Sequence, residues 1–542
     1  MHAEQGKSLK EVPAIAGYRL VRDPVDASVY ELIPPKSSSV SVGQAFDMAY
    51  AFQERHGARR VEPMFEVQMP RGFEKGDLFK GCHDPLAAKD DQWNLKQIRA
   101  PEAWLKIQNR FGIKPGQEAQ GISIAHIDTG YTRHPEIWQE SNNPIDVSDK
   151  DFKYDYYDND TDPTDPLRHD HLLDIPGHGT GSASVIVSPE GCQLPGAEGC
   201  ANGIARGAKV IPLRTSASVV LFDTRNLSRA IRDVAAGMVP GKPKLVSIAM
   251  GGPPTYTLLK AVESAEDNGV LIIAASGNYV GKVVWPARFR STIAVSAINV
   301  RCIPWKFSSH GEAVDISAPG ESVWRSQWKH GQAINSMGKG TTFATGNTSG
   351  AAALWMVWNG KNNSKMFDGL REQGLVTEAF RDAVKKSAWK PNQGSNPEGT
   401  HCSNSQNNTP WKTKEYGAGI LDVSALLGAA LPSDAKAASR LREARQELKN
   451  LPLFATLYPS DRRNRGPIER DYQSLFPASK RKDPAADLYR FETEIMYHYT
   501  MNETVQQPLD ALVQGKEEAA QQVIRALLEL DLSSELKKAL SE

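Results

Sequence analysis

The stretch that organises this chain begins with Gly340-Thr341-Thr342-Phe343-Ala344-Thr345 and runs on as Gly346-Asn347-Thr348-Ser349-Gly350-Ala351-Ala352-Ala353-Leu354-Trp355. A glycine turn followed by small residues predicts a helix that lies in a crowded interior, close to other backbones. The hydroxyls of Thr341 and Thr342 fall at the helix N-terminus, where free N–H groups and the positive end of the dipole meet. A hydroxyl there can act as a nucleophile, although a buried helix with a threonine N-cap is the commoner structure.

Two other stretches place an Asp and a His among glycines. Residues 121–130 (GISIAHIDTG) form an apolar run that predicts a strand ending at Asp128. An Asp at the carboxyl end of a strand is well placed to point into a site, although a lone Asp-x-Gly is more often a turn. Residues 177–186 (GHGTGSASVI) have glycines on both sides of His178, so neighbouring groups can approach it closely. Alone, this histidine would equally fit a surface loop.

These groups follow one another as Asp128, His178 and a hydroxyl at Thr342, which is one of the known orders of the Asp/His/Ser triad. With them, the chain resembles the subtilisin-like serine proteases (subtilases) over about residues 93–427. One departure matters, because the family carries a Ser where this chain carries Thr342. The resemblance is carried by several separate motifs: Asp128-Thr129-Gly130 with His134-Pro135-Glu136, Gly177-His178-Gly179-Thr180, residues 203–210, Ala249-Met250-Gly251-Gly252, Ala275-Ser276-Gly277-Asn278, Ser308-Ser309-His310-Gly311, Ala318-Pro319-Gly320 and residues 417–422.

The resemblance implies a role for each catalytic residue. His178 would remove the hydroxyl proton of Thr342, and Asp128 would hold the imidazole in the required tautomer. The side-chain amide of Asn278 and the backbone N–H of Thr342 would bind the oxyanion. The implied reaction is hydrolysis of peptide bonds.

Substrate binding is implied in the same way. Ala249-Met250-Gly251 would pair with an extended protein or peptide substrate as an added strand. Ala275-Ser276-Gly277 would form the facing wall of the first pocket, which we expect to be roomy because these residues are small. No metal is expected among the site residues, and no cofactor is required.

Thr342 leaves three functions open: a working endopeptidase that uses Thr, a pseudoprotease that binds a peptide or partner without cutting it, or a Ser enzyme slowed by an introduced Thr. The extra methyl restricts χ1 and adds bulk beside the attacked carbonyl. Known Thr nucleophiles are activated by their own terminal amine, which an internal residue lacks. Because Asp128, His178 and Asn278 all remain, the sequence favours a subtilisin-like endopeptidase with weakened or latent activity.

Bulk properties exclude several other classes. The 542 residues are too many for one ordinary core, and the balance of 64 basic and 64 acidic residues gives no field that would favour nucleic acid or an anionic membrane. The sequence contains no apolar run of about 18 residues and no apolar signal-peptide core, so we expect a cytoplasmic protein with no membrane span. Five cysteines argue against a disulfide scaffold. Cys192 and Cys200 bracket a Gly/Pro loop and could pair, but free thiols are favoured.

Residues 1–68 predict a small α+β domain, with strands at 18–21, 29–33 and 60–67 and a helix at 42–55. Its position resembles that of the family's inhibitory propeptide, which would make it an intramolecular inhibitor. An unrelated appended module is the alternative. Residues 69–91, rich in Gly, Lys and Asp, predict a linker.

Residues 92–430 alternate apolar runs at 122–127, 210–213, 244–250, 270–275 and 292–295 with helical stretches such as 228–236 and 257–267. Continuous apolar strands separated by helices predict a parallel sheet that is covered on both faces. The predicted fold class is therefore α/β: a subtilisin-like parallel sheet with helices on both faces, preceded by the propeptide-like domain and followed by a helical extension.

Residues 431–542 predict that helical extension, with helices at 434–448 and 516–530 and no catalytic motif. We expect it to be a regulatory extension or one that binds a protein partner. An acidic stretch within the α/β domain could bind calcium, but its spacing matches no known loop, and Pro163 and Pro166 interrupt it. A solvated acidic loop is favoured there. The oxygen-bearing side chains are those of Asp155, Asp158, Asn159, Asp160, Asp162 and Asp165.

Overall fold

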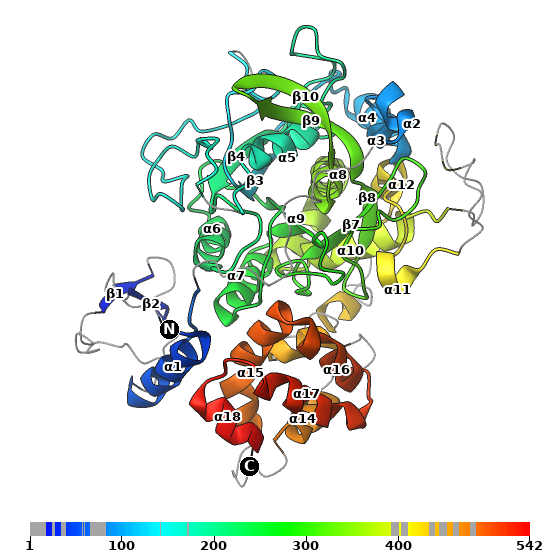
Figure 1. Cartoon of the computed structure of the whole chain (residues 1–542). Helices are drawn as coiled ribbons and strands as arrows, with labels where there is room; N and C mark the ends of the chain where they lie inside the picture. The colour runs from blue at the N-terminus through cyan, green and yellow to red at the C-terminus, as the bar shows by residue number, and fades with distance from the viewer. Residues whose placement is uncertain are drawn as a thin grey trace. The chain divides into compact units, whose positions relative to one another are not determined.

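The structure is a computed structural model that describes residues 18–23, 28–33, 40–56, 58, 60–65, 83–140, 143–170, 173–391, 400, 402, 410–432, 439–443, 452–458, 465–476 and 484–541. It divides into two compact units (Figure 1). The larger unit comprises residues 74–252 and 260–446, and the smaller unit comprises residues 1–73, 253–259 and 447–542. The predicted boundaries at 68, 91 and 430 stay predictions. Most of the predicted linker lies outside the described residues, but Pro85–Lys89 within it forms helix α2.

The larger unit is built on a parallel sheet of six strands in the order β4-β3-β5-β6-β7-β8. Almost every residue of these strands is buried, because helices cover both faces, and this confirms the fold class predicted from the continuous apolar runs. The sequence analysis did not identify β8. The strands are β3 (Ser123–Asp128), β4 (Lys209–Arg214), β5 (Leu245–Ile248), β6 (Leu271–Ala275), β7 (Ile293–Ile298) and β8 (Ile316–Pro319).

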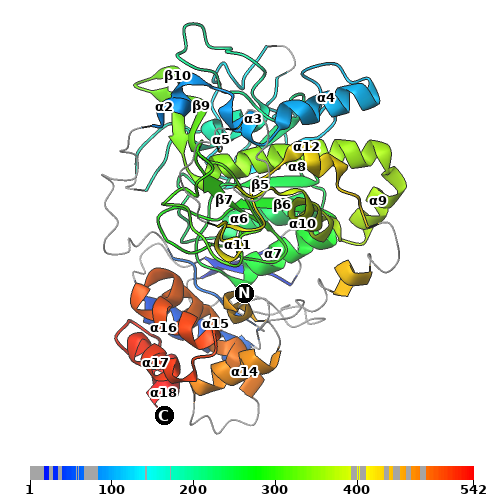
Figure 2. The same cartoon turned by 90° about the vertical axis from the view of Figure 1, so that its right-hand side faces the viewer.

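Helix α8 (Thr341–Asn362) lies on one side of the strands, and α7 (Tyr256–Asp267) lies on the other (Figure 2). Helix α5 (His178–Val187) packs beside α8. The sheet thus has the helical layers that the sequence predicts. The remaining helices of the larger unit are α3 (Trp93–Gln97), α4 (Ala100–Phe111), α6 (Arg225–Ala235), α9 (Ser364–Glu372), α10 (Val376–Ser387), α11 (Thr413–Tyr416) and α12 (Val423–Gly428).

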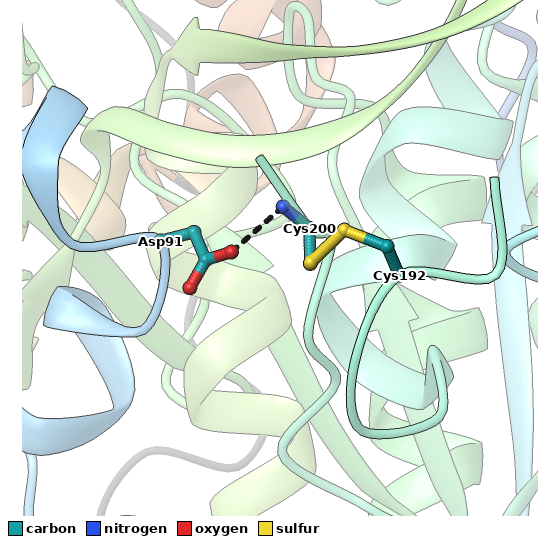
Figure 3. A group of neighbouring side chains, drawn as sticks. All are labelled: Asp91, Cys192 and Cys200. Carbon is teal, nitrogen blue, oxygen red and sulfur yellow. Dashed lines mark hydrogen bonds between the residues drawn. A yellow bond between two sulfur atoms is a disulfide. The ribbon is translucent and has the colours of Figure 1, made fainter. Parts of the chain in front are cut away.

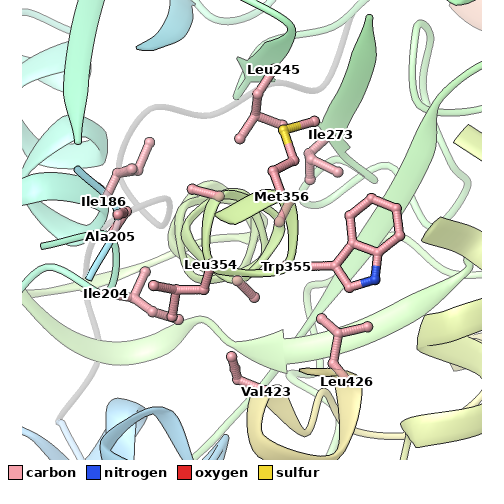
Figure 4. Packing of buried hydrophobic residues seen from close by; sticks show 14 of the residues in the cluster. Ile186, Ile204, Ala205, Leu245, Ile273, Leu354, Trp355, Met356, Val423 and Leu426 are labelled. Carbon is pink, nitrogen blue, oxygen red and sulfur yellow. The ribbon is translucent and has the colours of Figure 1, made fainter. Parts of the chain in front are cut away.

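Helix α8 runs through the main hydrophobic core, where Leu354, Trp355 and Met356 point to different neighbours around its axis (Figure 4). Small residues let those neighbours approach its backbone. A Cβ added to Gly350 would lie 1.8 Å from Cγ2 of Ile204. In a close-packed core such an overlap forces neighbouring groups to move. The core therefore explains why the residues that follow Thr342 are so small.

A hairpin that the sequence analysis did not predict leads into this helix. Strands β9 (Glu321–Lys329) and β10 (Gln332–Lys339) are antiparallel, and His330 and Gly331 form their two-residue turn with positive φ angles of 51° and 76°. The N–H of Gly340 donates to the carbonyl of Gly320 at 2.8 Å. The hairpin therefore returns the chain to the sheet just where α8 begins.

The smaller unit combines residues from both ends of the chain. Its antiparallel strands β1 (Arg19–Arg22) and β2 (Tyr30–Ile33) and its helix α1 (Val42–His56) confirm three elements predicted from the sequence. The third predicted strand is wrong for residues 60–65, because Pro63 lacks an N–H and the flanking side chains bind helices instead. The other elements are η2 (Leu453–Leu457), α14 (Arg465–Ser474), α15 (Pro484–Met501), α16 (Glu503–Val513), η4 (Glu517–Ala519), α17 (Ala520–Leu528) and α18 (Ser534–Ser541).

The remaining helix predictions have different outcomes. The predicted helix at 516–530 is present as η4 followed by α17. Residues 439–443 of the predicted helix at 434–448 are helical, and its other residues lie outside the described residues. The basic run at residues 462–465 is also outside them, apart from the start of α14.

Candidate active site

Strand β3 ends at Asp128, whose side chain is fully buried. Its Oδ1 lies 2.7 Å from Nδ1 of His178 and accepts the backbone N–H of Thr129 at 2.7 Å. Burial would raise the pKa of Asp128, but the charge of His178 and these hydrogen bonds outweigh it and hold the pKa below its usual range. Asp128 is therefore an ionised carboxylate that orients the imidazole.

His178 is the first residue of α5. Its approach to β3 depends on Gly179, because a Cβ there would lie 2.0 Å from the carbonyl oxygen of Gly130. Asp165, part of the acidic stretch, holds the same turn: its Oδ2 accepts the Thr129 hydroxyl at 2.9 Å and the Gly177 N–H at 2.7 Å. One carboxylate of that stretch thus supports the candidate site by hydrogen bonds.

The structure brings the nucleophile candidate to the other side of the same imidazole. Nε2 of His178 lies 3.1 Å from Oγ1 of Thr342, the second residue of α8. Thr342 is 5% exposed, so its hydroxyl is nearly enclosed. Asp128, His178 and Thr342 therefore form one hydrogen-bonded chain, in which the imidazole lies between a carboxylate and a hydroxyl.

Asn278 borders the same hydroxyl. Its Oδ1 accepts both the N–H and the hydroxyl of Thr341, each at 2.9 Å, in the amide orientation assigned from this network. Its Nδ2 and Oγ1 of Thr342 lie 3.4 Å and 3.5 Å from the position that a Cβ on Gly340 would take. Since Oδ1 accepts from Thr341, the amide nitrogen is the group of Asn278 that can donate to a developing anion.

The candidate substrate strand, Ala249-Met250-Gly251, directly follows β5. The N–H of Gly251 donates to the carbonyl of Val219 at 3.0 Å, and its carbonyl accepts the N–H of Leu221 at 2.9 Å. An extended peptide that pairs with Gly251 must therefore displace residues 219–221. Nothing in the sequence indicated that this edge would be occupied by the chain itself.

The facing wall, Ala275-Ser276-Gly277, is narrower than its composition suggests. The hydroxyl of Ser276 is turned inward and donates to the carbonyl of Ser309 at 2.9 Å. The side chain of Val284 lies 2.6 Å from the position of a Cβ on Gly251 and 3.1 Å from that of a Cβ on Gly277. Val284 thus occupies the space between the two glycines, and the expected roomy pocket is partly filled.

Two residues at the site were missed. The hydroxyl of Ser182 lies 3.1 Å from Oδ2 of Asp128 and 2.9 Å from Nε2 of His126, and both residues are buried. Burial lowers the pKa of His126, which favours its neutral form. A signal for His126 existed in the sequence, because the two-residue period of a strand places it on the same face as Asp128.

The disulfides correct the sequence analysis, which favoured free thiols. Cys192 is bonded to Cys200, and Cys302 is bonded to Cys402. Figure 3 shows the first pair beside Asp91, whose Oδ2 accepts the N–H of Cys200 at 2.9 Å. In the part of the chain that the structure describes, this is the one group of potential metal ligands with converging ligand atoms. With both sulfurs in a disulfide, it offers no thiolate to a metal.

The other acidic residues are used by the protein itself. Asp155 and Asp158 both form ion pairs with Arg214, so a guanidinium lies where the calcium hypothesis would put a cation. Asp160 and Asp162 accept backbone N–H groups of the residues two positions further on, as in Asx turns.

Sequence comparisons with known proteins agree on one family. The model of the Subtilase family (peptidase S8) matches residues 119–419. The major intracellular serine protease of Bacillus subtilis (strain 168) is 29% identical over 273 residues, which are 48% of this chain and 73% of that protein. Subtilisin Savinase of Lederbergia lenta is 28% identical over 272 residues, which are 49% of this chain and 84% of that protein. A solved structure described as proteases from Pseudoalteromonas arctica aligns with a TM-score of 0.46 and 19% identity over 63% of this chain and 97% of that one.

Proposed function

Because this chain belongs to the subtilase family of serine-type peptidases, we propose that it is an endopeptidase that hydrolyses peptide bonds with Asp128, His178 and the hydroxyl of Thr342. Thr342 makes this activity weaker than that of a Ser enzyme, or latent. The observation that carries the proposal is the position of the imidazole of His178, 2.7 Å from the carboxylate and 3.1 Å from the hydroxyl.

In this mechanism, Nε2 of His178 takes the proton from Oγ1 of Thr342 as the oxygen attacks the substrate carbonyl, and later returns it to the leaving amine. Asp128 keeps the proton on Nδ1 and stabilises the imidazolium. Nδ2 of Asn278 and the N–H of Thr342, at the start of α8, stabilise the oxyanion. Both Nδ2 of Asn278 and Oγ1 of Thr342 lie within 3.5 Å of the position of a Cβ on Gly340, which supports this role of Asn278.

The methyl group of Thr342 is the reason for the reduced activity. A β-branched side chain is stiff at χ1, so the hydroxyl cannot turn freely between the imidazole and the substrate carbonyl. The side chain is also nearly enclosed, at 5% exposure. The methyl therefore competes with the substrate for space at the position of attack.

The second candidate is a protein that uses the same site to bind a peptide or partner without cutting it. The N–H and carbonyl of Gly251 are already paired with Val219 and Leu221. A ligand that opens this pairing would exchange one set of backbone hydrogen bonds for another, which is compatible with binding alone. This candidate needs neither the hydroxyl of Thr342 nor the imidazole.

Labelling with a fluorophosphonate distinguishes the two functions. We expect a tag on residue 342 in the chain with Thr342, located by mass spectrometry, and a faster reaction in the Thr342→Ser variant. His178→Ala in either background should remove the tag. A chain that is never labelled, but binds peptides with equal affinity before and after His178→Ala, would support binding without catalysis.

The N-terminal residues are proposed to inhibit the peptidase in cis. Within the smaller unit, the carboxylate of Glu62 accepts the N–H groups of Tyr256 at 2.6 Å and Thr257 at 3.0 Å, so Glu62 helps to hold this segment in place. These N–H groups favour an anion, because they lie at a helix N-terminus. In the Thr342→Ser background, Glu62→Ala should increase cleavage of a small peptide, and no increase would count against inhibition by this segment.

We propose that calcium is not required. A calcium titration that leaves thermal stability unchanged would count against a calcium site.

The location of the protein is a separate proposal. No helix in the described parts of the chain is long and apolar enough to cross a membrane. The cytoplasmic location is opposed by the two disulfides, since the cytosol keeps most thiols reduced. Thiol trapping in the native cells tests the location, because free thiols at Cys192 and Cys200 would favour the cytoplasm.

A further inference from the structure

The described residues of 40–65, here called the N-terminal segment, contact helices α15 and α18 within the smaller unit. We propose that the C-terminal helices α14–α18 are a receptor for this segment and hold it after the chain is cut between residues 65 and 83. The ligand is an amphipathic helix followed by a short extended stretch of this same chain. The proposal goes beyond peptidase activity and holds whichever protease makes the cut.

The first support is an aromatic cluster that neither part could bury alone. Phe46 of α1 lies 6.1 Å from the ring of Tyr497 in α15, and Phe65 lies 4.7 Å from it. Tyr50 packs edge-on against Phe491 at 5.5 Å. Phe46 is only 2% exposed. Loss of the N-terminal segment would therefore expose a contiguous aromatic surface on α15.

The second support is that α15 buries charge which the N-terminal segment compensates. Glu492 is completely buried and forms an ion pair with Arg60, whose side chain is 7% exposed. Glu494, also completely buried, accepts the hydroxyl of Tyr50 at 2.8 Å. Carboxylates are rarely buried without such partners, because desolvation opposes it strongly. The receptor surface is therefore complementary to this segment in charge as well as in shape.

The third support is a close approach at the start of α1. A Cβ on Gly43 would lie 2.2 Å from the carbonyl oxygen of Leu532, and the N–H of Gly43 donates to Asp531 at 3.2 Å. Four residues on, Oδ1 of Asp47 accepts both the N–H and the hydroxyl of Ser534 at 2.8 Å, at the start of α18. The N-terminal segment thus contributes the cap of a C-terminal helix.

These contacts bind the two ends of the chain to each other, independently of the covalent link between them. The N-terminal segment lies far from α15 and α18 in sequence, so its attachment depends on the fit of residues such as Gly43, Arg60 and Phe65. A cut in the connecting chain removes none of these contacts. The expected product of such a cut is a complex of two fragments rather than a free N-terminal peptide.

The test uses the full chain with the recognition sequence of a site-specific protease inserted after residue 70. After complete cutting, both fragments should elute together in gel filtration at micromolar concentration. Gly43→Ala replaces a glycine by a better helix former, so it cannot weaken α1 itself, but its methyl meets Leu532. We expect this change to weaken retention by at least about ten-fold. Arg55→Ala, at an exposed position of the same helix, is the matched control and should retain the fragment.

Separation of the fragments in the otherwise unchanged sequence, or full retention in the Gly43→Ala variant, would overturn the proposal. Circular dichroism of the uncut variants checks that they fold. If Gly43→Ala does not fold, a double-mutant cycle with Tyr50→Phe and Glu494→Gln replaces it, since both changes conserve shape. Retention constants that change additively in that cycle would contradict the proposed contact, and coupling between the two changes supports it.

Discussion

Ser182 lies between Asp128 and His126, with its Oγ 3.1 Å from Oδ2 of the carboxylate and 2.9 Å from Nε2 of the imidazole. A serine hydroxyl has one proton to donate, so it can serve only one acceptor at a time. When the neutral His126 carries its proton on Nε2, it donates to Ser182, whose own proton is then available to Asp128. In the other tautomer Nε2 accepts from Ser182, and Oδ2 of Asp128 loses this donor.

Removing that donor should impair catalysis without removing a catalytic residue. A hydrogen bond to a charged group is worth about 1.5–3 kcal/mol, so Asp128 becomes a less stabilised carboxylate in a Ser182→Ala variant. Without this bond the carboxylate is held less firmly, so it orients the imidazole of His178 less well for proton transfer. In the Thr342→Ser background we expect kcat to fall about ten-fold with little change in KM. Steady-state kinetics with a small peptide measure kcat and KM separately.

Ser184→Ala is the matched control for this prediction. Its hydroxyl is also buried in α5, but it donates to the carbonyl of Gly181 and accepts the N–H of Ser326, and it does not contact Asp128. A purely structural effect of losing a buried serine would appear equally in both variants. An equal fall in kcat in the Ser184→Ala variant would therefore refute the role given to Ser182.

The sequence predicted those residues of the candidate site that lie in local motifs. Asp128, His178 and Thr342 each sit at the end of a strand or the start of a helix, and a nearby glycine marks each close approach. The partners that complete the site come from packing between elements. Ser182 looks like any small residue of a buried helix, and only the packing of β3 against α5 shows its hydroxyl facing Asp128.

Contacts between distant residues explain the other differences. Cys302 and Cys402 are 100 residues apart in sequence, and nothing local indicates that they meet. Tyr50 and Glu494 are 444 residues apart, so the sequence analysis treated the two ends of the chain as separate domains. The pocket was judged from three small residues of one wall, but Val284, which narrows it, belongs to the loop that follows.

Val284 should restrict the side chain that the first pocket accepts. Its N–H donates to the carbonyl of Ser276 at 2.9 Å, which fixes its side chain between Gly251 and Gly277. Val284→Ala removes two methyl groups, and each such group in a pocket is worth about 1–3 kcal/mol of selectivity. We expect kcat/KM for peptides with a large residue before the cleaved bond to rise at least about ten-fold relative to those with a small one. Peptide-library cleavage by variants in the Thr342→Ser background measures this preference.

Val280→Ala provides the comparison, because Val280 lies in the same loop but is 43% exposed. The Val280→Ala variant should prefer the same residues before the cleaved bond as the parent enzyme does. If Val284→Ala leaves the order of substrates unchanged, the valine does not line the pocket that binds this residue.

The stability of the smaller unit should depend on pH through Glu494. Burial raises the pKa of Glu494 from 4.5 to about 7, despite hydrogen bonds from Ser533 and Tyr50, and the charge of Asp47 adds to the rise. The folded state therefore binds more protons than the unfolded state between these values, so stability is lost as pH rises through this window. Burial also lowers the pKa of His498 from 6.5 to about 4, and this group has the opposite effect, with stability lost as pH falls.

Because these two effects oppose each other, the prediction concerns a difference between proteins. Glu494→Gln should stabilise helix α15 by about 1–3 kcal/mol relative to the parent at about pH 8, and by almost nothing at about pH 5. Native-state hydrogen exchange of α15, corrected for intrinsic rates, measures both values. Glu503→Gln, at an exposed position of α16, should give no difference at either pH. If Glu494→Gln increases the free energy of unfolding equally at both pH values, Glu494 does not titrate in this range.

Thr342→Ser should raise peptidase activity, because it removes one methyl and keeps the hydroxyl that lies 3.1 Å from Nε2 of His178. The smaller side chain regains freedom at χ1, so its oxygen can turn to both the imidazole and the substrate carbonyl. A positional error of about 1 Å can cost roughly a hundred-fold in rate. We therefore expect an increase of about ten-fold or more, with new cleavage within residues 69–91 visible on a gel. His178→Ala in this variant should abolish both effects, since the hydroxyl then has no base. Equal activity of the Thr and Ser forms would refute the steric argument, and activity that survives loss of His178 would refute the triad.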